Sequence, residues 1–399
     1  MKLFKSLLKF SFIFTLGFLS YYTIYVREQE PIFSIQAKLR RSVRNYIRPK
    51  FMKTDSSHWY NKGEKADFEL QYPYDPEKLI TINNISELDL KRAKMLQMVY
   101  GQESLPTKKL PSVKKKFIDN RYKDFEDIAY INKYTHEVKH GINSIAYHFI
   151  PYERNNKLII YHQGHGLGGI NGGDFIISKS KIEYFLNKGY EVIAMAMPLI
   201  GMNSQPLIYI DNLGYIKFNS HKKFSLLGKE NGEPEYHPFI YFFEPITVFL
   251  NQVNHEKYES VSMTGISGGG WTTTLYAAFD PRIKYSFPVA DGKPMTLNYR
   301  ALGHWEDREH MFFSKFNYHY LYVMGSSGEG RAKIQIVNYF EHLHPGDIYK
   351  YYKKPIQDRV KKIGLGLFDV FDDRSHATHE VSDKALEYIH SFIKNQDFK

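Results

Sequence analysis

One serine of the chain stands among glycines directly after an apolar run. Residues 265–269 read Gly-Ile-Ser-Gly-Gly, with Ser267 at the centre. This spacing is typical of a strained strand-to-helix turn that exposes a nucleophilic serine, because side chains two positions away would collide with the neighbouring strand and helix. A helix that begins at the serine also directs its positive dipole end toward the reacting oxygen. The alternative is a tight turn or a phosphate-binding loop, but no Gly-Lys-Ser/Thr ending follows.

Apolar runs alternate with helical patterns on both sides of Ser267. Residues 127–134 and 142–152 predict an antiparallel strand pair. Further strands are predicted at 157–164, 190–198, 260–265, 284–291, 333–341 and 365–373, and helices at 175–189, 241–254, 269–280, 351–363 and 381–394. Such alternation predicts an α/β fold with a mostly parallel sheet covered by helices on both faces. Functional loops then lie at the carboxyl ends of the strands, which is where Ser267 stands.

A family resemblance rests on residues 265–292, GISGGGWTTTLYAAFDPRIKYSFPVADG. This segment resembles the esterase branch of the α/β-hydrolase superfamily, related to acetyl-xylan esterases and dienelactone hydrolases. Those proteins often follow the nucleophile helix with an Asp-x-Arg turn, here Asp280-Pro281-Arg282. The resemblance covers residues 125–395, about two thirds of the chain. It implies the α/β-hydrolase fold and serine-dependent ester hydrolysis without a cofactor.

In this fold the catalytic serine, acid and histidine follow one another in that order along the chain, which indicates where the base should lie. Two histidines lie between the last predicted strand and the last predicted helix, His376 and His379. His379 directly precedes that helix, where the family's histidine usually sits, and is the first choice. His376 is the alternative, and the competing interpretation of either is a solvated loop histidine.

The third catalytic group is an acid that orients the histidine, and glutamate is accepted in this role. Glu341 ends the apolar run 333–341 and is the first choice. Glu329, Asp347 and Asp291 are the rivals, the last of them just after the preceding predicted strand. The structural alternative for Glu341 is a surface acid paired with a nearby lysine.

An oxyanion hole needs two backbone N–H groups aimed where negative charge develops. Gly268, the residue after the nucleophile, is expected to supply one. The loop at residues 162–169, His-Gln-Gly-His-Gly-Leu-Gly-Gly, occupies the place of the family's His-Gly-containing loop and is expected to supply the other. Alignment of Gly164 with the family glycine makes the His165 N–H the expected donor, with the Gln163 N–H as the alternative.

Three histidine-containing segments hold residue types that bind metals, but no metal is expected at any of them. His162 and His165 lack a nearby acidic ligand to complete a set. Neither EHLHPGD at 341–347 nor HWEDREH at 304–310 matches a defined ligand spacing. The aromatic insertion at 292–330 is expected to form a lid or a pocket wall with its Trp305, and Trp271 is a further candidate near the nucleophile.

The N-terminal region carries the basic character of the chain. The formal net charge is +11, and residues 1–54 hold eleven Lys/Arg against two Asp/Glu. Lysines precede an uncharged run from Phe10 to Val26, which predicts a signal anchor within residues 1–30. Residues 31–120 are expected to form a basic juxtamembrane and N-terminal extension, and residues 121–399 the catalytic domain. The catalytic domain is expected outside the cytoplasm.

Composition narrows the function further. The chain has 399 residues, 43% of them hydrophobic, and no cysteine, which excludes disulfides and thiolate chemistry. Basic residues are not spread over the folded domain, which argues against nucleic-acid binding. The sequence therefore predicts a membrane-tethered serine ester hydrolase that acts on a small-molecule or carbohydrate-linked acyl ester. A peptidase or acyltransferase on the same fold and an inactive hydrolase-like binding module remain alternatives.

Overall fold

The computed structural model describes residues 74–165, 178–230, 233–234, 236–291, 294, 305–341 and 346–396. These residues belong to one compact unit that spans residues 65–399. Within the described ranges, no helix combines the length and the apolar character that a bilayer crossing requires. The anchor predicted at residues 1–30 lies outside the described residues.

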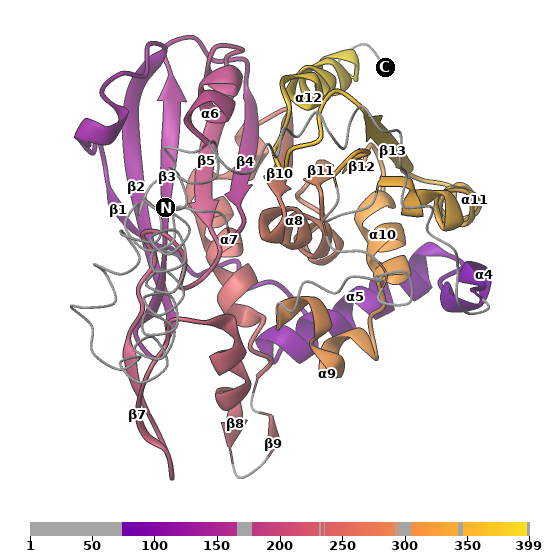
Figure 1. Cartoon of the computed structure of the whole chain (residues 1–399), viewed down its shortest axis with the longest axis horizontal. Coiled ribbons are helices and arrows are strands. Elements are labelled where there is room, and N and C mark those ends of the chain that lie inside the picture. Colours follow the sequence, from indigo (N-terminus) through magenta and orange to yellow (C-terminus); the bar gives the residue numbers. More distant parts are fainter. Residues whose placement is uncertain are drawn as a thin grey trace, which may run out of the picture. The chain divides into compact units, whose positions relative to one another are not determined.

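A large mixed sheet forms the centre of this unit. Its strands are β1 (Ser112–Lys114), β2 (Ile128–Lys139), β3 (Ile142–Pro151), β4 (Lys157–Gln163), β5 (Glu191–Ala196), β10 (Ser260–Ile266), β11 (Tyr285–Val289), β12 (Ala332–Asn338) and β13 (Leu367–Asp373). Their spatial order is β1-β2-β3-β5-β4-β10-β11-β12-β13 (Figure 1). Pairs from β5 to β13 are parallel, whereas β1, β2 and β3 pair antiparallel. The predicted antiparallel pair and the parallel strands after it are both confirmed.

Helices cover both faces of the sheet, as expected for buried parallel strands. On one face lie α6 (Lys179–Leu186) and α12 (Asp383–Asn395), and on the other α5 (Ile85–Tyr100), α7 (Ile240–Val253), α8 (Gly268–Phe279), α10 (Tyr318–Ser326) and α11 (Lys353–Ile363). Strand β4 shows the division: Ile159 and Tyr161 enter the core under α6 and α12, while Leu158 and Ile160 enter the opposite core. The two-layered core follows from the two-residue alternation of a strand.

Several short elements complete the described chain. They are α4 (Pro76–Leu79), α9 (His310–Phe313), the hairpin β6 (Leu207–Ile210) and β7 (Gly214–Lys217), the pair β8 (Lys229–Glu230) and β9 (Glu233–Pro234), and the 3₁₀ turns η1 (Asn120–Tyr122), η3 (His221–Leu226), η4 (His255–Lys257), η6 (Glu306–Arg308) and η7 (Gly346–Tyr351). Two of these turns, η3 and η6, carry residues of the candidate site.

Helix α5 joins this core although it precedes residue 121. Met95 and Val99 are fully buried, and Arg92 Nε donates to the carbonyl of Ala278 at the end of α8 over 3.1 Å. Figure 1 shows α5 next to α8, far from it in sequence. Part of the predicted N-terminal extension therefore packs into the same core and supports the helix that follows Ser267.

Candidate active site

Ser267 stands in a strained turn between β10 and α8. Its backbone has φ 58° and ψ −121°, a combination that a residue with a side chain rarely adopts and that costs about 1–3 kcal/mol. The Ser267 N–H donates to the carbonyl of Val289 over 3.0 Å, which ties the turn to the end of β11. Ser267 is half-buried, whereas the residues before and after it are buried. The strained backbone therefore keeps Ser267 accessible at the carboxyl edge of the sheet.

The glycines two positions before and two positions after Ser267 allow the turn to pack against β4. A Cβ atom on Gly265 would lie 2.5 Å from the carbonyl oxygen of His162, and one on Gly269 would lie 1.9 Å from the same oxygen. Both distances are far below van der Waals contact, so a side chain at either position would displace backbone. The collision predicted from the Gly-x-Ser-x-Gly spacing is present in the structure.

His379 and Glu341 are brought together from the ends of two neighbouring strands. Glu341 follows β12, and His379 follows β13 and precedes α12. His379 Nδ1 donates to Glu341 Oε1 over 2.7 Å, with the glutamate side chain 1% exposed and the imidazole 30% exposed. Asn338 Nδ2 donates to Glu341 Oε2 over 3.0 Å and to the carbonyl of Glu380 over 3.0 Å. Asn338 therefore fixes the Glu341 carboxylate directly and the backbone of the residue that follows His379.

The rival acids and the rival histidine lie in other surroundings. Asp291 is buried and accepts hydrogen bonds from Thr274 Oγ1 at 2.5 Å and Gln335 Nε2 at 2.7 Å. Glu329 is exposed, and His376 Nδ1 lies 3.6 Å from Asp373 Oδ2. The side chain of Asp347 falls outside the described part, as do His304, His342 and His344. Of the candidate acids described, Glu341 is the one hydrogen-bonded to His379.

The loop after β4 passes directly beside the start of α8. A Cβ on Gly164 would lie 2.4 Å from the carbonyl of Ile266 and 2.9 Å from the amide nitrogen of Gly268. The His165 imidazole lies against Gly268, because a Cβ there would be 2.8 Å from His165 Nδ1. Residues 166–169 of the predicted oxyanion loop lie outside the described residues. The two expected oxyanion donors, Gly268 and His165, are thus neighbours in space.

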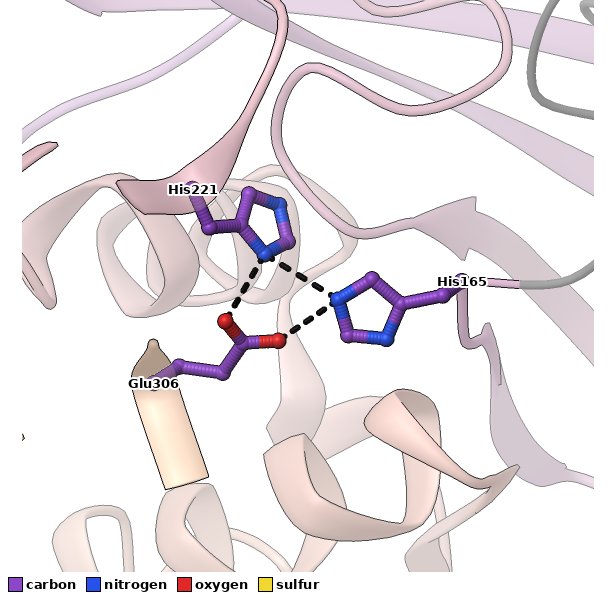
Figure 2. A group of neighbouring side chains, drawn as sticks. All are labelled: His165, His221 and Glu306. Carbon is purple, nitrogen blue, oxygen red and sulfur yellow. Dashed lines mark hydrogen bonds and ion pairs between the residues drawn. The ribbon is translucent and has the colours of Figure 1, made fainter. Parts of the chain in front are cut away.

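Three side chains that the sequence did not connect meet at His165. Figure 2 shows His165, His221 and Glu306 pointing toward one another from the loop after β4, from η3 and from η6. His165 Nε2 lies 2.6 Å from Glu306 Oε1, His221 Nδ1 lies 3.0 Å from Glu306 Oε2, and the two ring nitrogens are 3.1 Å apart. The expectation that His165 lacks an acidic neighbour is wrong, because Glu306 supplies one from a distant turn.

Contacts within this buried cluster shift the pKa values of Glu306 and His221 in favour of their charged forms. Burial by itself raises the pKa of Glu306, but the neighbouring His221 and His165 outweigh it and hold that pKa well below its usual range. Burial lowers the pKa of His221, and Glu306 more than compensates, so the net shift is upward. By contrast, burial lowers the pKa of His162 to about 3, and its Nδ1 faces the carbonyl of Gln163 at 3.1 Å. His162 is therefore a neutral core residue.

The two tryptophans expected near the site, Trp271 and Trp305, have mainly structural surroundings. Trp271 is fully buried and packs against Phe239, Phe242 and Phe243, so its interpretation as a substrate wall is wrong. Trp305 is half-buried and lies edge-on to Phe239, next to Glu306 in sequence. The ring of Trp305 therefore packs on the aromatic core, at Phe224 and Phe239.

Comparisons with known proteins reach the level of the fold. No family model matches the chain, and no curated protein matches it. The solved glucuronoyl esterase from Solibacter usitatus is similar over 77% of this chain and 91% of that chain, with a TM-score of 0.51 and 14% identity. An acetyl xylan esterase from Paenibacillus sp. R4 is matched over 81% of this chain and 99% of that chain, with a TM-score of 0.49 and 13% identity.

The first of these similarities and the strand order define the fold of the chain. The chain has the α/β-hydrolase fold, with the mostly parallel sheet and the helical layers that the resemblance of residues 265–292 implied. At 14% identity the similarity establishes the fold alone. The chemistry must be argued from the site itself, because this fold carries many functions.

Proposed function

We propose that the protein is a serine-dependent carboxylic-ester hydrolase. The observation that carries this proposal is the strained, accessible Ser267 at the junction of β10 and α8. Backbone strain of this kind persists at positions where function requires a side chain to be presented. The hydrogen bond between His379 and Glu341, which follow two parallel neighbouring strands, adds support for a base and its orienting acid.

In the proposed reaction Ser267 Oγ attacks the acyl carbonyl carbon. His379 accepts the serine proton and returns it to the departing alkoxide, which leaves an ester of Ser267 and the acyl group. Water then attacks this acyl-enzyme with the same imidazole as base, and releases the acid. Glu341 accepts the Nδ1–H of His379, so that Nε2 is the nitrogen that exchanges the proton and the imidazolium is stabilised.

The negative charge of the tetrahedral intermediate requires two N–H donors. We assign these to the backbone of Gly268, at the positive end of α8, and of His165. Support comes from the close approach of Gly164 and the His165 ring to the first residues of α8.

Replacement of the nucleophile tests the proposal. Ser267→Ala is expected to lower hydrolysis of p-nitrophenyl acetate by about 10⁴-fold or more and to abolish labelling by a fluorophosphonate probe. Ser314→Ala is the matched control, because Ser314 is exposed and its hydroxyl donates only to a local carbonyl of Met311 at 3.3 Å. Labelling that persists in the Ser267 variant would overturn the assignment, and wild-type protein without labelling would favour an inactive binding module.

We infer the substrate to be a small acyl ester on a carbohydrate or other envelope component. The support is the fold shared with a protein named glucuronoyl esterase and the anchor predicted within residues 1–30. A panel of p-nitrophenyl esters from acetyl to decanoyl is expected to show the highest kcat/KM for acetyl. Highest activity on long chains would point to a lipid substrate, and cleavage of an aminoacyl amide would point to a peptidase.

The membrane tether is part of the same proposal. The uncharged run from Phe10 to Val26 after three lysines supports a single anchor with the catalytic domain outside the cytoplasm. Membrane fractionation with protease protection tests it: the hydrolase domain is expected in the membrane fraction and open to external protease.

A further inference from the structure

His165, His221 and Glu306 form a donor set that the proposed hydrolysis does not use. Each residue offers one ligand atom, and these atoms all lie within 4.8 Å of one another. The three residues come from separate segments of the chain, and they meet in the interior: Glu306 is 1% exposed, His221 is buried and His165 is 20% exposed. Two imidazoles and one carboxylate are a common ligand set of zinc sites that keep a coordination position open.

The distances between the ligand atoms suit a single small cation. Ligand atoms bound to one zinc ion at about 2.0–2.1 Å in tetrahedral geometry lie about 3.3 Å apart. The two histidine nitrogens are 3.1 Å apart, and the contacts of Glu306 with His165 and His221 measure 2.6 and 3.0 Å. All three contacts are shorter than this, that of Glu306 with His165 the most, so an ion requires the side chains to separate by less than about 1 Å.

The orientation of His221 provides an independent argument. Its Nε2 lies 2.8 Å from the carbonyl oxygen of Pro198, and because a carbonyl only accepts, Nε2 must carry the proton. In the neutral imidazole this leaves the lone pair on Nδ1, the atom that faces Glu306 and His165. Metal-binding histidines almost always donate their second ring N–H to such a carbonyl or carboxylate.

We propose that His165 Nε2, His221 Nδ1 and Glu306 bind one divalent transition-metal cation, for which zinc is the first candidate. Imidazole and carboxylate ligands fit zinc and its neighbours in the first transition row, whereas magnesium and calcium prefer all-oxygen sites. The cation replaces the direct contacts among the three side chains and neutralises the carboxylate.

The site also has a consequence for the catalytic centre, which rests on the proposed function. The ring of His165 lies against Gly268, the residue after Ser267. A cation on that ring fixes the chain at His165, whose backbone N–H is the proposed second oxyanion donor. His165 is thus a positioning residue through its side chain and an oxyanion donor through its backbone.

Direct metal binding tests the site on the purified full-length chain. After treatment with a chelator and dialysis, zinc is titrated by calorimetry and cobalt by visible absorption. The expected result is one ion per chain, with cobalt absorption bands typical of a site of low coordination number. Absence of stoichiometric binding to the folded wild-type protein would overturn the proposal and leave a hydrogen-bonded ion cluster in its place.

Variants locate the ion. Glu306→Gln and His221→Ala are each expected to weaken zinc binding by about 100-fold or more, since even outer partners of a metal site are worth about 10–100-fold. Glu309→Gln is the matched control: Glu309 Oε2 accepts from buried His237 over 2.7 Å, but no second imidazole joins them in the described structure. Because buried variants can unfold, His165→Ala at the most exposed ligand gives a further test. Wild-type affinity in the folded Glu306 or His165 variant would contradict the assignment.

Activity measurements separate this inference from the proposed function. The metal-free protein is expected to retain fluorophosphonate labelling at Ser267 but to lose kcat by up to about 10²-fold, which zinc restores, because a single oxyanion donor is worth about that much. An unchanged kcat after metal removal would overturn the positioning role. Zinc binding without any labelling would instead overturn the hydrolase and leave the metal site standing.

Discussion

Glu341 and Glu306 are both buried carboxylates that face histidine, yet they differ in how many imidazoles they meet. Glu341 accepts from one imidazole, that of His379, and its second oxygen is taken by the amide of Asn338. Glu306 presents one oxygen to His165 and the other to His221. A carboxylate that accepts from one imidazole fixes the tautomer of that ring. A carboxylate shared by two imidazoles brings three potential metal ligands together.

The two carboxylates are also held by different parts of the fold. Glu341 stands just beyond β12 and its histidine just beyond β13, so both depend on neighbouring parallel strands. Glu306 and His221 stand on short 3₁₀ turns, and His165 on a loop. Exposure follows the same division, since His379 is 30% exposed and His221 only 5%. The strand ends leave His379 partly exposed to solvent, and the 3₁₀ turn encloses His221.

Replacement of Glu341 by a neutral amide should have the largest effect on activity. Glu341→Gln is expected to lower kcat for an acetyl ester by about 10³–10⁴-fold, because the amide no longer enforces the Nδ1–H tautomer of His379. Asp291→Asn is the matched control at the adjacent strand end, and less than a tenfold loss is expected. A larger loss in the Asp291 variant than in the Glu341 variant would break the comparison and make Asp291 the acid.

Changes in the turn that carries Ser267 should have a large effect on stability. Gly269→Ala is expected to lower the free energy of unfolding by about 3 kcal/mol or more, because the new Cβ meets the His162 carbonyl at 1.9 Å in a close-packed region. Urea denaturation measures the change. Gly101→Ala is the control, since its positive φ of 71° costs only about 1 kcal/mol and no atom lies within 4 Å. Equal costs in the two variants would show that the turn relaxes easily.

A prediction on the pH dependence of stability concerns Lys333, a buried lysine close to the rival acid Asp291. Its Nζ donates to Thr274 Oγ1 over 3.0 Å, and Thr274 donates to Asp291. Burial lowers the pKa of Lys333 to about 7 from its usual 10.5. Between these values the unfolded chain binds the extra proton, so the contribution to stability is full above the unfolded pKa and is lost as pH falls through about 7.

The corresponding measurement compares wild type with Lys333→Met. From pH 7 to 10 the free energy of unfolding of the wild type is expected to rise relative to that of the variant, by at most about 1.4 kcal/mol per pH unit. Lys384→Met, on the exposed side of α12, controls for the loss of one positive charge. A constant difference across this range would show that Lys333 stays charged when buried, and that the surroundings of Asp291 are ionic in the way those of Glu306 are.

The sequence predicts those parts of the molecule whose signals are local or follow from topology. Ser267 is marked by adjacent glycines, and parallel strands bring their carboxyl ends to one edge, so the meeting of His379 with Glu341 could be anticipated. The cluster at His165 could not, because His221 lies 56 residues away on a short turn without any periodic pattern. The segment at 304–310 matches no defined ligand spacing, yet its Glu306 is the residue that points toward His165 and His221. The role expected for Trp271 was wrong because the sequence does not show whether an aromatic ring close to Ser267 lines a pocket or fills a core.

The contact between the His162 carbonyl and the glycines beside Ser267 has a consequence for how this region can vary. Only two residues separate His162, whose carbonyl packs against the Ser267 turn, from His165, which reaches Glu306. Loops ordinarily tolerate insertions and deletions. Here a change of one residue would pull either the carbonyl away from the turn or the imidazole away from the cluster, so the length of this short segment is as constrained as the identity of the serine it adjoins.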